Sequence, residues 1–307
     1  MVDSIYFPFG KGIQGSSGNW YKILQHLGTG GNSVVFLVLA SDGNNQGSLF
    51  ALKMFRRLSI KSRRDRFIRE SAFLVDCKHT SITPIYDTGT YNIRGQEYPF
   101  LITEYQPITL GHVIRTGTVS KIEKISYILQ TLSALKYLAN QTPAIVHRDI
   151  KPQNIFINGP SCMLGDFGLI KAIDGDDDED RNLIVESQEV AMPFAYRTPD
   201  LISYSKKESD ITPKSDVFQL GVVAAELFTG WNPQVPTNNL LDPLRMKTLG
   251  KISGKYGGQI KDLIQRMIVS DPNQREGASE LMDSWQGAFE NVAGETHALE
   301  GYVFSRE

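Results

Sequence analysis

The chain has 307 residues, of which 41% are hydrophobic and 21% are charged, and its formal net charge is −2. This composition is ordinary for a soluble globular protein, and it argues against a disordered chain and against a strongly basic nucleic-acid-binding protein. The length exceeds that at which one hydrophobic core usually keeps growing, so we expect two lobes.

The first hundred residues are predicted to be mostly sheet. The opening twenty are rich in Gly and Ser, and we expect an arm or loop there. Alternating apolar residues predict strands, the first two of which are joined by the glycine turn GTGGN. These strands are expected at 21–27, 33–40, 49–55, 82–91 and 98–104. Between the third and the fourth, residues 59–76 have helical spacing.

From Leu110 onward the period changes to that of helices, most strongly over residues 122–139. Further helices are expected at 214–229, 258–269 and 277–290. The sequence therefore predicts an α+β, bilobal fold with a small β-rich lobe that has one main helix, a larger α-helical lobe, and a joint at about 104–107.

Two segments have unusual charge. The run DGDDDED at 174–180 has closely packed like charges, which predict a solvated loop. The segment KSRRDRFIR at 61–69 is strongly basic, and it is either a solvated helix face or a docking patch for an acidic partner or loop.

The cysteines and the N-terminus bear on location. Cys77 and Cys162 are too few for a disulfide framework and lack the spacing of metal ligands. The N-terminus lacks the basic region and apolar core of a secretory signal, and no stretch approaches the ~18 apolar residues of a membrane span. We predict a cytoplasmic protein that binds neither membrane nor nucleic acid.

The octet HRDIKPQN places polar residues between two apolar runs. In it, Asp149 can accept a hydroxyl proton, Lys151 can neutralise charge on a phosphoryl group, and Asn154 offers a neutral oxygen to a divalent cation. Twelve residues later, Asp166 offers a second metal ligand. With the glycine turn and Lys53 upstream, these are the parts that phosphoryl transfer needs.

This ordered set of motifs resembles the eukaryotic-type serine/threonine protein kinases over residues 21–290. Lys151, two residues after Asp149, is similar to the serine/threonine pattern, and the departures noted below look more like bacterial than animal members. The implied parts are an N-terminal arm at 1–20, an N-lobe at 21–104, a C-lobe at 105–290 with an activation segment at 166–200, and a C-terminal tail at 291–307.

The resemblance implies ATP and Mg²⁺ as cofactors. Lys53, paired with Glu70, would hold the α- and β-phosphates, and Thr103 would gate the back of the adenine pocket. Ser33 stands where a third glycine is usual in the phosphate loop. The implied nucleotide contacts are Gly28, Gly30, Gly31, Ser33, Val35, Ala51, Lys53, Thr103, Glu104, Tyr105 and Phe156.

The resemblance also implies the catalytic roles. Asp149 would be the base, Lys151 would stabilise charge, and Asn154 with Asp166 would hold the magnesium ions. The implied catalytic set is Asp149, Lys151, Lys53, Glu70 and Asn154. The substrates would be proteins with Ser or Thr acceptors, and the kinase would also phosphorylate itself.

Two later motifs agree with this interpretation. The segment SDVFQLG resembles a buried helix whose aspartate, here Asp216, braces the backbone of the catalytic loop. Arg275 matches a position that pairs with an acid at the end of the activation segment. That acid would be Asp200, although the chain has Thr-Pro-Asp where Ala-Pro-Glu is usual.

One departure leaves alternatives open. Pro193 stands where the family usually has a Thr or Ser whose hydroxyl contacts the catalytic aspartate and lysine, and proline has no such donor. The alternatives are a kinase-fold binding module without turnover and a small-molecule phosphotransferase of related fold.

Regulation is the other open point. In the family that the chain resembles, the arginine at the position of Arg148 commonly binds a phosphate on the activation segment. Here that phosphate would be on Ser187, or else the acidic run at 174–180 supplies the negative charge. We expect a phosphoprotein controlled by its own loop or by a regulatory partner, and the sequence does not define an oligomeric state.

Overall fold

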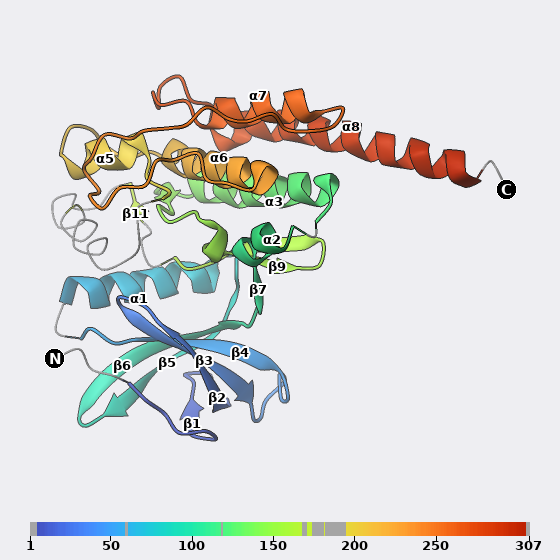
Figure 1. Ribbon diagram of the computed structural model, residues 1–307. Coiled ribbons are helices and arrows are strands. Elements are labelled where there is room, and N and C mark those ends of the chain that lie inside the picture. The colour runs from blue at the N-terminus through green and yellow to red at the C-terminus, as the bar shows by residue number, and fades with distance from the viewer. Residues whose placement is uncertain are drawn as a thin grey trace. The chain divides into compact units, whose positions relative to one another are not determined.

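The computed structural model describes residues 5–58, 61–117, 119–167, 171–173, 181 and 195–304. The chain divides into two compact units (Figure 1). Unit 1 comprises residues 1–78 and 82–106, and unit 2 comprises residues 79–81 and 107–307. Unit 1 is mostly sheet and unit 2 is mostly helical, so the predicted α+β fold class is confirmed.

Unit 1 is built on a six-stranded antiparallel sheet with the order β1-β2-β3-β4-β6-β5. Its strands are β1 (Gly12–Gln14), β2 (Trp20–Thr29), β3 (Ser33–Ala40), β4 (Leu49–Phe55), β5 (Ile85–Ile93) and β6 (Gln96–Glu104). β3 and β4 have the predicted bounds. Both alternate between buried and less buried residues along most of their length, and this period-2 pattern is the one that sequence reveals best.

The two faces of this sheet carry different apolar clusters. Phe36, Leu52 and Phe100 belong to the main core on one face. On the opposite face, the helix α1 (Lys61–Asp76) packs Phe67 against Phe55 and Leu101. Successive side chains of a strand point to opposite faces, so strand residues that alternate with the main core lie on the same face as α1.

The N-terminal segment differs from the arm predicted over residues 1–20. β1 pairs with β2, and Ile13 is fully buried in the main core together with Phe7. The turn after β1 is held by Asp87 of β5, which accepts hydrogen bonds from the Ser17 amide at 3.2 Å and the Tyr21 hydroxyl at 3.1 Å. A three-residue strand in a Gly- and Ser-rich segment is too short to show a period, and the prediction was wrong for that reason.

Unit 2 consists mainly of helices, with short strands beside them. The helices are α2 (Leu110–Thr116), α3 (Lys121–Ala139), α5 (Pro199–Ser205), α6 (Lys214–Thr229), α7 (Gly257–Met267) and α8 (Ala278–Phe304). The strands are β7 (Ile108–Thr109), β8 (Ile145–Val146), β9 (Ile155–Asn158), β10 (Ser161–Leu164) and β11 (Lys171–Ala172), and η1 (Pro152–Asn154) is a 3₁₀ turn. α3 packs against α6 and α8, and α6 packs against α7 (Figure 1).

Local chemistry explains where these helices begin and end. α3 starts at a capping box in which Ser120 and Glu123 satisfy each other's backbone N–H groups. α8 was predicted to stop at 290, before a C-terminal tail, but it continues to Phe304. Val292 is still buried, four residues after buried Ala288, so the apolar stripe extends past the predicted end, although Gly294 and Gly301 weaken the helical signal there.

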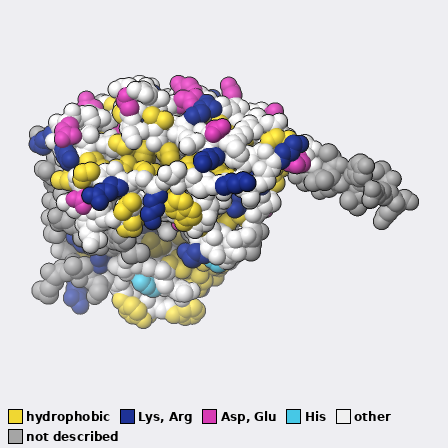
Figure 2. All heavy atoms as spheres, turned by 45° about the horizontal axis from the view of Figure 1, so that its top comes forward, with side chains coloured by type: hydrophobic (Ala, Val, Ile, Leu, Met, Phe, Trp, Pro, Cys, Tyr) yellow, Lys and Arg dark blue, Asp and Glu magenta, His cyan; other side chains and the backbone are white. Residues whose placement is uncertain are grey.

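The described side chains on one face of the molecule carry charges of both signs (Figure 2). On the face shown in Figure 2, acidic side chains lie mainly along the upper edge, and Lys and Arg lie among apolar side chains below them. No helix in the described ranges is both long and apolar enough to cross a bilayer. Cys77 and Cys162 are free thiols.

Candidate active site

The HRDIKPQN octet forms a loop after β8 that ends in the η1 turn. The Asp149 carboxylate lies at its centre. Lys151 Nζ donates to Asp149 Oδ1 at 3.0 Å and to Oδ2 at 2.9 Å. Asn154 Nδ2 donates to the Asp149 carbonyl at 2.9 Å and to Oδ2 at 2.8 Å. The structure thus brings the three polar residues singled out in the sequence into direct contact.

Asp166 acts electrostatically on the same carboxylate. Burial raises the pKa of Asp149, the Lys151 ammonium lowers it, and the Asp166 carboxylate raises it further, so the net shift is upward. The Asp166 backbone is left-handed, with φ of 56°, and its side chain is exposed. An exposed carboxylate close to a second acid is a natural position for a cation.

The loop backbone is braced from α6. Asp216 Oδ2 accepts from the His147 amide at 2.7 Å, and Oδ1 accepts from the Arg148 amide at 2.8 Å. The brace predicted for Asp216 is confirmed. Burial raises the pKa of this carboxyl, and the two N–H donors counteract that shift. Arg148 has a left-handed φ of 66°, a conformation that a non-glycine residue keeps only when its neighbours fix it.

Gln219 is a second brace, to which the sequence analysis assigned no role. Its Oε1 accepts from the Ile150 amide at 2.9 Å, and its Nε2 donates to the Arg148 carbonyl at 3.1 Å and to the Tyr196 carbonyl at 2.9 Å. The available signal was its position. Gln219 is a polar residue three positions after Asp216, and therefore on the same face, within an otherwise apolar stretch of helix.

His147 connects the octet to the turn before Asp166. Its Nδ1 accepts from the Asp149 amide at 3.3 Å, and its Nε2 lies 3.2 Å from the Gly165 carbonyl. This pattern fits a neutral imidazole with its proton on Nε2. The ring also packs edge-on against Phe167, with centroids 4.6 Å apart. His147 is fully buried, so it serves as an internal strut.

The pair expected at the end of the activation segment is present. Arg275 Nη1 donates to Asp200 Oδ2 at 2.8 Å, and both side chains are almost fully buried, at 0% and 2% exposure. Arg275 also donates to the carbonyls of Val269 and Lys214, each at 2.7 Å. Asp is therefore long enough to replace the usual Glu here.

In unit 1, the predicted nucleotide contacts share one face of the sheet. Val35 pairs with Lys53 across the β3 and β4 strands, and Ala51 pairs with Thr103 across β4 and β6. All four alternate with residues of the main core, so they lie on the opposite, α1-bearing face. Lys53 Nζ lies 6.0 Å from the centre of the Phe67 ring on α1.

The glycine turn joins β2 to β3. Gly30 N donates to the Ser33 carbonyl at 2.8 Å, which closes the turn. A Cβ atom at Gly28 or Gly31 would meet nothing within 4 Å, and neither residue has a left-handed φ. Neighbouring atoms and backbone conformation therefore do not explain these glycines, whereas a ligand approaching the backbone would.

The remaining predicted residues are dispersed. Glu104 ends β6, Tyr105 follows it, and Phe156 is a half-buried residue of β9 in unit 2. Glu70 belongs to α1, but its side chain lies outside the described residues. Pro193, Ser187 and the acidic run at 174–180 also lie outside them.

Asn154 and Asp166 fit a hard cation such as Mg²⁺. Because Asn154 Nδ2 donates to Asp149, the amide oxygen Oδ1 is the atom that remains for a metal. An amide and a carboxylate oxygen are suitable donors, and Mg²⁺ usually takes its other ligands from water and phosphates. Within the described residues there is no group of three or more His, Cys, Asp or Glu that could hold a metal.

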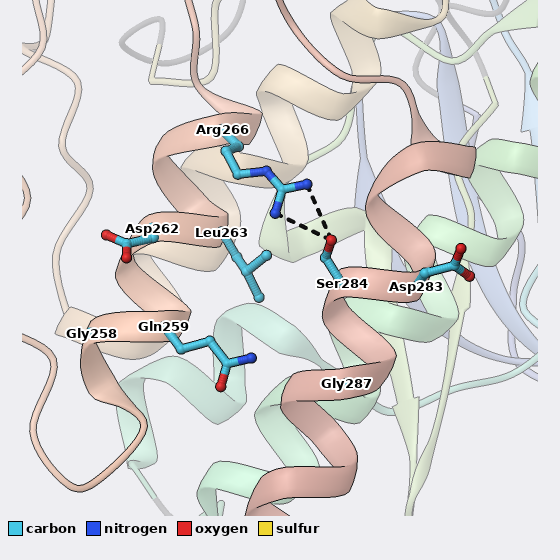
Figure 3. Close-up of a pocket in the computed structure, with 8 residues that line it drawn as sticks. All are labelled: Gly258, Gln259, Asp262, Leu263, Arg266, Asp283, Ser284 and Gly287. Atoms are coloured by element: carbon cyan, nitrogen blue, oxygen red, sulfur yellow. Dashed lines mark hydrogen bonds between the residues drawn. The ribbon is translucent and has the colours of Figure 1, made fainter.

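A hollow of about 600 Å³ lies between α7 and α8 (Figure 3). It is lined by residues of these two helices and by none of the catalytic loop. Arg266 at its edge pairs with Glu276 and donates to Ser284 at 3.1 Å, so its guanidinium is already engaged. The hollow contains none of the predicted site residues.

Comparisons with known proteins show the family to which the chain is similar. A family model described as the protein kinase domain matches residues 21–285. Serine/threonine-protein kinase WNK3 of Mus musculus is 26% identical over 275 residues, which are 87% of this chain and 15% of that protein. Serine/threonine-protein kinase PknB of Mycobacterium tuberculosis is 28% identical over 226 residues, 69% of this chain and 33% of that protein. The chain thus spans a third or less of the length of these relatives.

Proposed function

Because the chain belongs to the protein kinase domain family, we propose that it transfers the γ-phosphate of ATP to Ser or Thr hydroxyls of protein substrates. The observation that best supports this is the Asp149 carboxylate, which Lys151 and Asn154 hold on a loop braced by Asp216. Both relatives named above are serine/threonine kinases by name, which supports the choice of acceptor.

Asp149 accepts the proton of the attacking hydroxyl. An aspartate with a raised pKa is a better proton acceptor than an ordinary one, and the raised pKa of Asp149 follows mainly from its burial. Lys151, in contact with both carboxylate oxygens, neutralises charge that develops on the phosphoryl group. The two residues thus divide proton transfer and charge stabilisation between them.

Asn154 and Asp166 would hold Mg²⁺. The ion, when bound, neutralises charge on the phosphate oxygens and orients them. For the chain's own residues, the consequence is that the Asn154 amide links metal binding to the base, because its Nδ2 is bonded to Asp149 while its Oδ1 stays available.

In unit 1, Lys53 with Glu70 would position the α- and β-phosphates, and the glycine turn would cover them with backbone N–H groups. The open space at Gly28 and Gly31 supports this assignment. Val35 and Ala51 would contact adenine. Thr103 would line the back of the pocket, and the backbone at Glu104 and Tyr105 would meet the adenine edge.

The test is incubation of the purified chain with γ-labelled ATP, Mg²⁺ and a generic basic protein. We expect labelled phosphoserine or phosphothreonine, lost on chelation of Mg²⁺ and reduced about 10²–10⁴-fold by Asp149→Asn. Nucleotide binding without any transfer would instead indicate a binding module. Transfer only to small hydroxyl compounds would indicate a small-molecule phosphotransferase.

We also propose autophosphorylation at Ser187. Chain produced with Asp149→Asn should lack phosphate at this residue in a mass spectrum, and Ser187→Ala should lower the activity of the otherwise unchanged enzyme. Equal activity of Ser187→Ala and wild type would favour the acidic run at 174–180 as the source of negative charge.

A further inference from the structure

We propose that Gln219 is a positioning residue that couples the catalytic loop to residues 195–198, at the end of the activation segment. Within the proposed kinase function, it would hold the base and the substrate-side segment in a fixed relation. The inference rests on three hydrogen bonds of one buried side-chain amide, which accepts one and donates two.

One side of this connection is the backbone around the base. The Arg148 carbonyl belongs to the peptide group before Asp149, and the Ile150 amide belongs to the peptide group after it. Gln219 bonds both, at 3.1 Å and 2.9 Å, and is only 3% exposed. A single side chain therefore fixes the peptide plane on each side of the Asp149 Cα atom, which limits the directions that its carboxylate can take.

The other side is the Tyr196 carbonyl, to which Gln219 Nε2 donates its second hydrogen bond at 2.9 Å. Both Nε2 hydrogens are thus used, and Oε1 is an acceptor. Reversing the amide would place its NH₂ group against the Ile150 N–H and its oxygen against two carbonyl oxygens. The orientation is therefore fixed by three partners, and movement of one segment displaces the amide that holds the other.

The residue at position 193 of the sequence offers no alternative hydrogen-bond donor. Pro193 has neither a side-chain hydroxyl nor a backbone N–H, so it cannot donate a hydrogen bond to Asp149 or Lys151. Gln219 links the catalytic loop to the Tyr196 carbonyl from α6, and this link does not use position 193.

Other side chains hold residues 195–198 without reaching the catalytic loop, as far as the described ranges extend. Gln234 pairs with the Arg197 amide at 3.1 Å and with its carbonyl at 2.6 Å, and Asn232 donates to the Ala195 carbonyl at 2.7 Å. Gln234 is as buried as Gln219, at 4% exposure. It therefore serves as a control that disturbs the substrate-side segment alone.

A third glutamine provides a control for stability. Gln130 on α3 also makes three hydrogen bonds, to Ser126 Oγ at 2.9 Å, to the Pro160 carbonyl at 2.9 Å and from the Cys162 amide at 2.8 Å. None of these groups belongs to the catalytic loop or to residues 195–198. Gln130→Met thus removes as many bonds as Gln219→Met from a different part of unit 2.

The experiment compares Gln219→Met, Gln234→Met and Gln130→Met, since methionine keeps the length of the side chain. We expect Gln219→Met to lower kcat for protein phosphorylation about 10–100-fold, with KM for ATP changed less than about threefold. Gln234→Met should raise KM for the protein substrate and leave ATP hydrolysis without protein unchanged. Gln130→Met should change neither kcat nor the KM for ATP or for the protein substrate.

Amide hydrogen exchange gives a readout that does not depend on activity. Gln219→Met should speed exchange in peptides covering both 145–156 and 195–199, Gln234→Met only in the second, and Gln130→Met in neither. Wild-type exchange in both peptides of Gln219→Met would overturn the coupling. A loss of kcat in Gln130→Met equal to that in Gln219→Met would also overturn it.

Failure of the proposed function is distinguishable from failure of this inference. If the wild-type chain transfers no phosphate, the kinase proposal fails, but the exchange comparison still decides whether Gln219 couples the two segments. Should Gln219→Met not fold, Gln219→Asn replaces it. That variant keeps an uncharged amide but is one methylene shorter, so it cannot reach all three partners, and exchange should still rise in both peptides while kcat falls.

Discussion

The catalytic loop of unit 2 and the glycine turn of unit 1 are both short connections, but they are held in opposite ways. Side chains of α6 make four hydrogen bonds to the backbone of residues 147–150. The glycine turn is closed by the bond from Gly30 N to Ser33, and a Cβ at Gly31 would find empty space. Under the proposed function, this difference means that the surroundings of Asp149 fix the direction of the base, whereas the glycine turn leaves room for phosphates.

The strongest way to break the comparison is to remove the Asp216 brace. Asp216→Ala leaves the buried His147 and Arg148 amides without acceptors, which should lower the free energy of unfolding by about 2–6 kcal/mol and phosphotransfer by more than about 100-fold. Denaturant unfolding and a kinase assay measure the two effects. Asp262→Ala, at an exposed acid of α7, should change stability by less than about 0.5 kcal/mol. Equal effects of the two substitutions would contradict the brace.

The buried Asp200–Arg275 pair should contribute more to the stability of unit 2 than the partly exposed Glu276–Arg266 pair. Asp200→Ala leaves the Arg275 charge buried and should cost about 3–5 kcal/mol of unfolding free energy. Glu276→Ala breaks the Arg266 pair, whose side chains are 38% and 32% exposed, and should cost at most about 1 kcal/mol. Similar losses in thermal or chemical unfolding would show that burial does not distinguish the pairs.

The glycine turn should respond in the opposite sense. Gly31→Ala meets no neighbouring atom, so stability should stay the same or rise by up to about 1 kcal/mol, because alanine restricts the unfolded chain. The added methyl group takes up ligand space, so KM for ATP should rise about tenfold, or about 1.4 kcal/mol.

Gly221 is the matched glycine for this test. A Cβ there would lie 2.7 Å from Ile268 and Met267, so Gly221→Ala should cost about 1–3 kcal/mol of stability through overpacking and leave KM for ATP nearly unchanged. An unchanged KM in Gly31→Ala would remove the argument that its turn is kept open for a nucleotide.

The smallest expected effect is a difference in alkylation between the two cysteine thiols, Cys77 in unit 1 and Cys162 in unit 2. Burial raises the pKa of Cys162 to about 12, and this residue is 1% exposed. Its thiol therefore stays protonated when the pH rises from 7 to 9, because both values lie well below the pKa. Iodoacetamide should label half-buried Cys77 and spare Cys162 in the native protein, as peptide mass spectra would show. Equal labelling rates would mean that the interior of unit 2 opens readily.

The sequence predicted those parts of the fold whose signal is periodic. β3, β4 and α6 have the predicted bounds because alternation or helical spacing runs through them without interruption. β1 was missed because a strand of three residues is too short to show an alternating pattern. The length of α8 was underestimated because its glycines weaken the apolar pattern of the helix. The pairing of Asp200 with Arg275 came from the resemblance to protein kinases, and the structure confirms it as a buried ion pair.

The candidate site shows the limit of such inference. Residue types at fixed spacing indicated Asp149, Lys151 and Asn154, and the structure shows how they contact one another. Gln219 could not be assigned a role in this way, because a neutral amide does not by itself indicate catalysis. Its role depends on the backbone carbonyl and N–H groups that the fold places around it. Its position three residues after Asp216 marks it as a polar residue on the same helix face, but its bonding partners depend on tertiary structure.

The N-terminal segment has a practical consequence for work with this protein. Trimming the chain to start at residue 21 would leave β2 as an exposed edge and strip Phe7 and Ile13 from the apolar layer they help to form. A bare edge with unpaired amides and carbonyls invites sheet-to-sheet association between molecules. A shortened version would therefore be prone to aggregate during expression, even though every catalytic group remained in place.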